Sequence, residues 1–244
     1  MKLLKIIILG LGALAASSAF VSCTREVPLV ATVQPGTGGS ATVQIFSATV
    51  RAARNYIYVD GAPVSGVAIG IGSIFPATAY AFKVSPGAHT FLIKDTLPAT
   101  TQVPLTFSQA LDSGKSYTIF TYDTITNVKQ STIVNTIEIA TDTTARLRFA
   151  NFIYNTTAVP AVDVYSFRKG TSAAVFTNVA TLQVTPFIPY QTGISDTLYV
   201  YATGTTAPLI VKQVVPNLTP GRSYTATYNG SFKGTKSIST FATY

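Results

Sequence analysis

The stretch Leu111-Asp112-Ser113-Gly114-Lys115-Ser116-Tyr117-Thr118 decides the fold, because it returns later as Leu218-Thr219-Pro220-Gly221-Arg222-Ser223-Tyr224-Thr225. Both stretches fit the pattern L-x-x-G-[KR]-S-Y-T. Two further matches precede them in the same order, 41–46 against 145–149 and 55–60 against 161–165. Three ordered matches, separated by about the length of one small domain, predict an internal repeat. The chain therefore reads as two copies of one domain.

Within each copy, apolar and polar residues alternate with a period of two, which predicts half-buried β-strands. Val43 and Ile45 alternate with Thr42 and Gln44 in the first copy. Leu147 and Phe149 alternate with Arg146 and Arg148 in the second. Turn dipeptides separate the strands; they are Asp60-Gly61, Pro86-Gly87, Lys169-Gly170, Pro220-Gly221 and Asn229-Gly230. The expected fold class is all-β, with two tandem immunoglobulin-like (Greek-key) β-sandwich domains at 41–142 and 143–244.

The N-terminus has the layout of a secretory signal. Lys2 and Lys5 precede an apolar run at 6–16, and a mostly small and polar segment leads to Cys23. The apolar segment is shorter than the roughly 20 residues of a transmembrane helix. Cys23 is the lone cysteine, so no disulfide can form within the chain. We expect a signal peptide at 1–22, and a modified cysteine with a Pro/Gly-rich flexible tether at 23–40.

The segment Phe20-Val21-Ser22-Cys23 resembles the lipobox of bacterial lipoproteins, with Phe20 in place of the usual Leu. The resemblance implies cleavage before Cys23 and its acylation by fatty acids such as palmitate. Several acyl chains hold a protein durably on a membrane, since each buried CH₂ contributes about 0.8 kcal/mol. Thr24 stands where an Asp would signal inner-membrane retention, so the expected location is the outer membrane. Both the periplasmic and the surface-facing orientation remain open.

Two further resemblances concern the folded part. The L-x-x-G-x-x-Y element resembles the tyrosine corner of Greek-key sandwiches, which implies structural roles for Tyr117 and Tyr224. The motifs 145–151, 160–165, 85–90 and 114–118 are similar to those of the bacterial domain of unknown function 4397. The first copy lacks the A-V-D motif of that family, and the second lacks its Pro-Gly-x-His turn. This resemblance covers 41–244 and implies a fold and an envelope setting, without an activity.

Composition argues against several functions. The formal net charge is +8, but the basic residues form short scattered pairs such as Arg146/Arg148 and Arg168/Lys169. A nucleic-acid-binding protein usually concentrates basic residues on one face, so we expect a solvated basic surface and no nucleic-acid partner. His89 is the only histidine, the nine acids are dispersed, and no G-x-S-x-G occurs. We therefore expect no catalytic residue, no metal site, no cofactor and no enzymatic activity.

Two tyrosine pairs are candidates for a ligand face. Tyr56/Tyr58 and Tyr199/Tyr201 each sit at i, i+2 on an expected strand, so both rings of a pair share one side of a sheet. Aromatic rings can stack on sugars, although the chain has no Trp. The alternative, which we favour, is cross-strand packing of common strand residues.

Four Asp-Thr sequences resemble the D-[ST]-aliphatic/Thr acceptor of O-glycosylation in Bacteroidetes. The threonines concerned are Thr96, Thr124, Thr143 and Thr197. Some matches are expected by chance in so Thr-rich a chain.

Taken together, these features predict a cell-envelope lipoprotein acting as a non-catalytic binding or structural module. Its partners would be the membrane, through the lipid anchor, and a protein or glycan. The alternative is a glycan-binding accessory lipoprotein of a polysaccharide uptake system.

Overall fold

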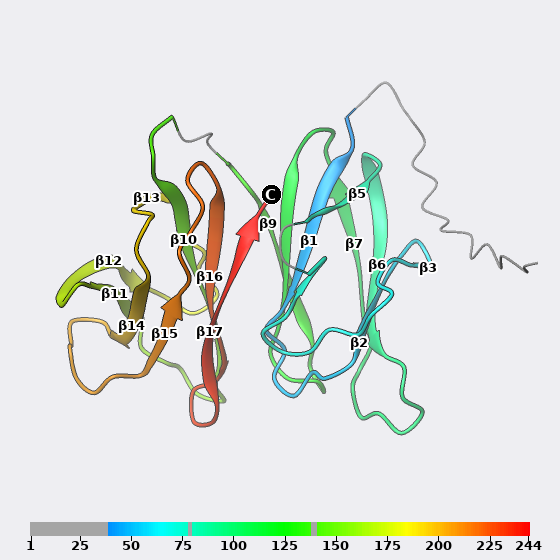
Figure 1. Ribbon diagram of the computed structural model, residues 1–244. Coiled ribbons are helices and arrows are strands. Elements are labelled where there is room, and N and C mark those ends of the chain that lie inside the picture. Colours follow the sequence, from blue (N-terminus) through cyan, green and yellow to red (C-terminus); the bar gives the residue numbers. More distant parts are fainter. Residues whose placement is uncertain (1–38, 78–79, 138–140) are drawn as a thin grey trace, which may run out of the picture. The chain divides into compact units, whose positions relative to one another are not determined.

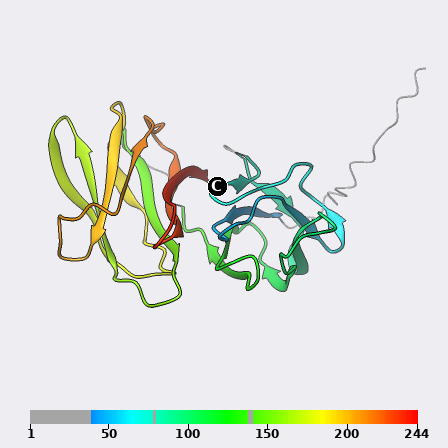
Figure 2. The same cartoon turned by 90° about the horizontal axis from the view of Figure 1, so that it is seen from below.

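The computed structural model describes residues 39–77, 80–137 and 141–244. These residues all belong to one compact unit and form seventeen β-strands, with no helix among them (Figures 1 and 2). The predicted all-β class is confirmed. The strands make four sheets, two from β1–β9 and two from β10–β17.

The first nine strands make sheets I and II. In sheet I, β4 and β5 both pair with β1, and the order continues β1-β8-β9. Sheet II has the order β3-β2-β6-β7. The bounds are β1 Ala41–Ser47, β2 Asn55–Val59, β3 Ala62–Pro63, β4 Ile74–Phe75, β5 Phe82–Val84, β6 Gly87–Asp95, β7 Leu105–Leu111, β8 Ser116–Tyr122 and β9 Lys129–Val134.

The last eight strands make sheets III and IV. Sheet III has the order β13-β10-β16-β17, and sheet IV has the order β12-β11-β14-β15. The bounds are β10 Ala145–Tyr154, β11 Val162–Arg168, β12 Thr171–Val179, β13 Ile188–Tyr190, β14 Asp196–Ala202, β15 Val211–Val215, β16 Ser223–Ser231 and β17 Lys236–Thr243.

Sheets I and III have the same construction. The strand that opens each half pairs in parallel with the strand that carries the repeated tyrosine, β1 with β8 and β10 with β16. Tyr117 lies opposite Val43, and Tyr224 lies opposite Leu147. In each half that tyrosine strand continues into an antiparallel neighbour, β9 or β17. The sequence repeat thus corresponds to a repeated strand arrangement.

The strand order differs in one respect from that of a constant-type immunoglobulin domain. In constant-type immunoglobulin domains the first and second strands share one sheet. Here the first strand of each half lies in sheet I or III, and the second lies in sheet II or IV. The all-β sandwich architecture is confirmed, and the immunoglobulin-like strand order stays a prediction.

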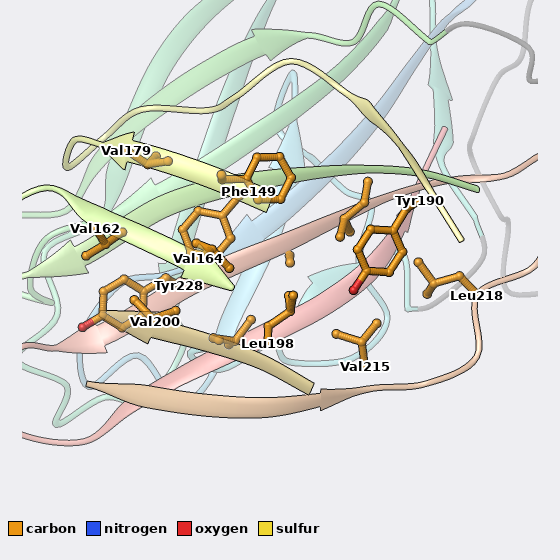
Figure 3. Close-up of a cluster of buried hydrophobic side chains, with 14 of the residues drawn as sticks. Phe149, Val162, Val164, Val179, Tyr190, Leu198, Val200, Val215, Leu218 and Tyr228 are labelled. Carbon is orange, nitrogen blue, oxygen red and sulfur yellow. The ribbon is translucent and has the colours of Figure 1, made fainter. Parts of the chain in front are cut away.

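Each pair of sheets encloses an apolar core made by the alternation along its strands. Between sheets III and IV, Phe149 and Tyr228 meet Val164, Leu198 and Val200, all of them fully buried (Figure 3). Between sheets I and II, Val43, Ile45 and Ile119 meet Ile57, Phe91 and Ile93. In β2 of sheet II and β14 of sheet IV, the core residues alternate with more exposed ones, as expected for a sheet with one buried face.

Sheets I and III are also buried on their second faces, because they contact each other there. Phe46 stacks on Phe241 with 5.3 Å between ring centroids, and Phe120 stacks on Phe152 at 4.4 Å. Polar groups are buried in the same contact: the Gln44 amide donates to the Ala242 carbonyl at 2.9 Å. Residues that alternation predicted to face water therefore lie inside the molecule.

Arg148 is the clearest of these residues, and the expectation of a solvated basic pair was wrong for it. Its side chain is 3% exposed. Its guanidinium donates to Thr225 Oγ1 at 2.8 Å and to Asn135 Oδ1 at 2.8 Å. Burial lowers the pKa of Arg148 to about 10, so the group stays charged at neutral pH. Its partners are neutral, and they come from both halves of the chain.

Candidate functional site

The predicted signal peptide and Cys23 lie outside the described residues. Gly39 is the first described residue, and its carbonyl accepts a hydrogen bond from Ser113 Oγ at 2.7 Å. Over 39–77, 80–137 and 141–244, no helix is long and apolar enough to cross a membrane.

The tyrosine pair of the first half lies on the outer face of sheet II. Along β2 the core residues Ile57 and Val59 alternate with half-buried Tyr56 and Tyr58. The Lys94 ammonium lies 5.0 Å from the centre of the Tyr58 ring, in a cation–π contact. One side of the Tyr58 ring is therefore covered by this lysine.

The pair of the second half belongs to a larger cluster, the sheet IV aromatic face, made of Tyr165, Phe167, Tyr199 and Tyr201. The Tyr199 and Tyr201 rings lie nearly parallel with centroids 6.4 Å apart. Tyr165 contacts Tyr201 edge-on at 5.7 Å, and Phe167 contacts Tyr199 edge-on at 5.5 Å. Such contacts are those of cross-strand aromatic packing. Phe167 still has 40% of its surface exposed, so the cluster also meets solvent.

The two repeated tyrosines hydrogen-bond to backbone upstream of them. Tyr117 Oη accepts from the Asp112 N–H at 2.9 Å, and Tyr224 Oη accepts from the Thr219 N–H at 3.1 Å. In both cases the donor lies five residues before the tyrosine. This is the backbone contact that defines a tyrosine corner. Each bond joins the turn that begins at the repeated Leu to the strand that follows.

His89 lies beside Asp60 and Ser85, an arrangement that invites comparison with a catalytic triad. Its Nδ1 is 2.6 Å from Asp60 Oδ2, and its Nε2 is 2.8 Å from the Ser85 carbonyl and 3.4 Å from Ser85 Oγ. A general base needs a free lone pair facing the nucleophile. Nε2 instead faces a carbonyl oxygen, to which it can only donate. The ring therefore ties the Asp60-Gly61 turn to the start of β6, and its hydrogen bond lowers the pKa of Asp60.

The four Asp-Thr sequences share one local geometry. Each aspartate accepts a hydrogen bond through Oδ1 from a backbone N–H one or two residues later, at 2.6–2.9 Å. Aspartates commonly stabilise turns in this way. Thr96 and Thr143 are exposed, whereas Thr124 and Thr197 are half-buried. Turn formation thus accounts for Asp95, Asp123 and Asp142 independently of any modification, whereas Asp196 begins β14.

Sequence reasoning missed a cleft of about 350 Å³, the Tyr154 cleft. It is lined by the ends of β8 and β10, the start of β9 and the loops at 155–161 and 180–182. Phe152 forms part of the wall, with Tyr122 tilted against it at 5.8 Å. Asp123 and Lys129 pair at 2.8 Å at its edge. The volume lies at the lower end of the range for small-ligand sites.

A second hollow of about 730 Å³ also has Tyr154 in its lining. Most of its other residues carry hydroxyl or amide groups. No local pattern in the sequence predicts either hollow, because the lining residues come from segments far apart in the chain.

Comparison with known proteins adds no family. The chain matches no protein-family model, and no curated protein matches it. In the part of the chain that the structure covers, no three His, Cys, Asp or Glu residues gather closely enough to hold a metal ion.

Proposed function

We propose that this chain is a cell-envelope lipoprotein whose β-sandwiches act as a non-catalytic binding module. The acyl chains on Cys23 would hold it at the outer membrane, and the tether at 23–40 would separate the folded part from the bilayer. The lipobox-like sequence before Cys23 supports the anchor. The envelope setting is also what the resemblance to the domain of unknown function 4397 implies.

The sheet IV aromatic face is the observation that carries the binding role. Four aromatic side chains and Lys212 gather on one side of β11, β14 and β15, and Val214 beside them is 59% exposed. Exposed aromatic clusters are typical of interaction surfaces, since they bury much apolar area at low conformational cost. The rings already support one another, so little further ordering is needed on binding.

The anchor is tested by metabolic labelling with a palmitate analogue in a bacterial host. The wild-type chain should carry the label in the membrane fraction, and Cys23→Ala should carry none. Label that persists in Cys23→Ala would refute acylation at this residue.

A glycan-binding accessory role is the second candidate function, and the hollows around Tyr154 favour it. Hydroxyl and amide side chains next to an aromatic ring are the groups that sugars contact. A glycan array probed with the mature chain tests this role. Binding to a defined set of glycans would support it, and silence across plant, host and bacterial glycans would leave the protein-partner role.

A further inference from the structure

We infer that the Tyr154 cleft and the adjoining hollow bind a neutral oligosaccharide of two or more linked pyranose rings. The inference rests on the glycan-binding function proposed above and names the site and ligand class for it. The sheet IV aromatic face, which the sequence suggested for this role, is the weaker site. There the ring of Tyr199 already contacts Phe167, Tyr201 and Lys212.

Tyr154 supplies the aromatic platform. It ends β10 and is half-buried. Among the described residues, its ring has no aromatic or cationic side chain stacked against it, in contrast to Tyr58, Tyr165 and Tyr199. The C–H groups on one face of a pyranose pack on such a ring through dispersion and burial of apolar area.

Thr181 supplies a polar group that lacks a partner within the protein. Its Oγ1 is buried in the cleft lining and makes no hydrogen bond to any described residue. Leaving a buried hydroxyl unpaired is costly, so a ligand group that pairs with it gains affinity. Asn155 and Thr157, which hydrogen-bond to each other at 3.0 Å, add further donors and acceptors to the same lining.

The charges of the cleft indicate a neutral ligand. Asp123 and Lys129 are the only carboxylate and ammonium in its lining, and they pair with each other at 2.8 Å. The cleft therefore presents no unbalanced charge to an anion or a cation. Its apolar walls and neutral donors fit a molecule that has apolar faces and hydroxyl edges.

The adjoining hollow indicates a ligand longer than one ring. Because Tyr154 lines both hollows, they adjoin at this residue, and a chain of linked sugars bound in the first would extend into the second. The second lining is rich in hydroxyl and amide groups, including Thr101, Thr124, Thr126, Asn229 and Ser237. Arg51 is exposed there and can donate to ring or glycosidic oxygens.

Isothermal titration calorimetry on the acylated protein in detergent tests the inference. The probes are neutral di- to hexasaccharides of glucose, mannose, galactose and N-acetylglucosamine, with a medium-chain fatty acid as a competing apolar probe. For the sugar that binds, Tyr154→Ala should raise Kd about 10-fold or more, and Tyr154→Phe should keep it within about 3-fold. Thr181→Val, which removes one hydrogen bond, should raise Kd about 3- to 10-fold. Tyr199→Ala, on the sheet IV aromatic face, should leave Kd unchanged.

The outcomes separate this inference from the proposed function. If a sugar binds but loses affinity in Tyr199→Ala and keeps it in Tyr154→Ala, the cleft is refuted and glycan binding stands. If only the fatty acid binds, the neutral-sugar assignment is wrong. If none of these neutral sugars binds while the glycan array shows binding to other glycans, the neutral-ligand inference is refuted and glycan binding stands. Silence in both experiments refutes both. Circular dichroism of each variant confirms that a lost affinity is not a lost fold.

Discussion

Asp196 shows at the residue scale how this protein uses a buried charge. Its Oδ2 accepts hydrogen bonds from Ser166 Oγ at 2.5 Å, from Arg168 Nε at 2.7 Å, and from the hydroxyl of Tyr190. Arg168 also lies 4.1 Å over the Tyr190 ring. The carboxylate thus joins β11 and β14 of sheet IV to β13 of sheet III. It belongs to the framework rather than to a ligand surface.

Asp196→Asn should destabilise the fold by about 3 kcal/mol, since removing one partner leaves a largely buried guanidinium unpaired. Urea unfolding followed by circular dichroism measures this as a lower midpoint at an unchanged slope. The matched control is Asp142→Asn, because Asp142 is an exposed carboxylate paired with Arg146 at 3.3 Å. Its loss should lower the unfolding midpoint much less, because solvent screens an exposed ion pair. Equal losses in the two variants would contradict the structural role of Asp196.

The same carboxylate makes stability depend on pH. Burial alone would raise the pKa of Asp196, but the hydrogen bonds from Ser166, Tyr190 and Arg168 outweigh it and hold the pKa below its ordinary 3.8. A carboxylate whose pKa is lower in the folded than in the unfolded state stabilises the fold when the pH is above its unfolded-state pKa. This stabilisation is lost as the pH falls through the folded-state pKa. The contribution of Asp196 to the melting temperature should therefore be constant above about pH 5 and should decline below about pH 4. Asp196→Asn should show a smaller decline than wild type.

At the scale of elements, the two tyrosine corners and their neighbour Tyr228 provide an internal comparison. Tyr117 and Tyr224 hold the turns before β8 and β16 through their hydroxyl groups. Tyr228, further along β16, has a buried hydroxyl without a partner among the described residues. These three tyrosines on two equivalent strands thus differ in what their hydroxyl groups contact.

Tyr117→Phe and Tyr224→Phe should each lower stability by about 1 kcal/mol, because each removes a backbone hydrogen bond at a turn. Tyr228→Phe should be neutral or stabilising, since it removes a buried polar group that gains nothing from the fold. The denaturant midpoints of the three variants measure the order of their stabilities. A larger loss in Tyr228→Phe than in Tyr224→Phe would refute this account of the corners.

The sequence predicted those strands whose position depends on a local residue pattern. Alternation identified the strands that carry Val43, Leu147 and Tyr199, and the repeated L-x-x-G-[KR]-S-Y-T identified the equivalent strands β8 and β16. Arg148 shows where this reasoning ended. Alternation with a period of two indicates which side chains point away from the core. It does not indicate whether another sheet covers those side chains. The Tyr154 cleft was missed because its lining residues come from segments that are far apart in the sequence.

At the scale of the whole described molecule, sheets I and III act as the two middle layers of one structure. Their contact combines the stacked rings of Phe46, Phe241, Phe120 and Phe152 with buried polar side chains. Arg148 has no carboxylate partner among the described residues, and its hydrogen bonds reach Thr118 and Asn135 in one half and Thr225 in the other. A buried cation held by neutral groups tolerates little displacement, because any lost bond leaves it unpaired. This contact therefore couples the two halves.

That coupling predicts one cooperative unfolding transition for the wild-type protein. Phe241→Ala should cost about 3 kcal/mol or more, since it removes a buried ring that stacks on Phe46 across the contact. Calorimetry should then show a broader or divided transition, because the halves lose part of the contact that joins them. Phe167→Ala, on the exposed sheet IV aromatic face, should leave a single transition with a small shift. A single sharp transition in Phe241→Ala, displaced to lower temperature without broadening, would contradict a coupling role for Phe241. The Phe120–Phe152 stack and the hydrogen bonds of Arg148 and Gln44 would then suffice to couple the halves.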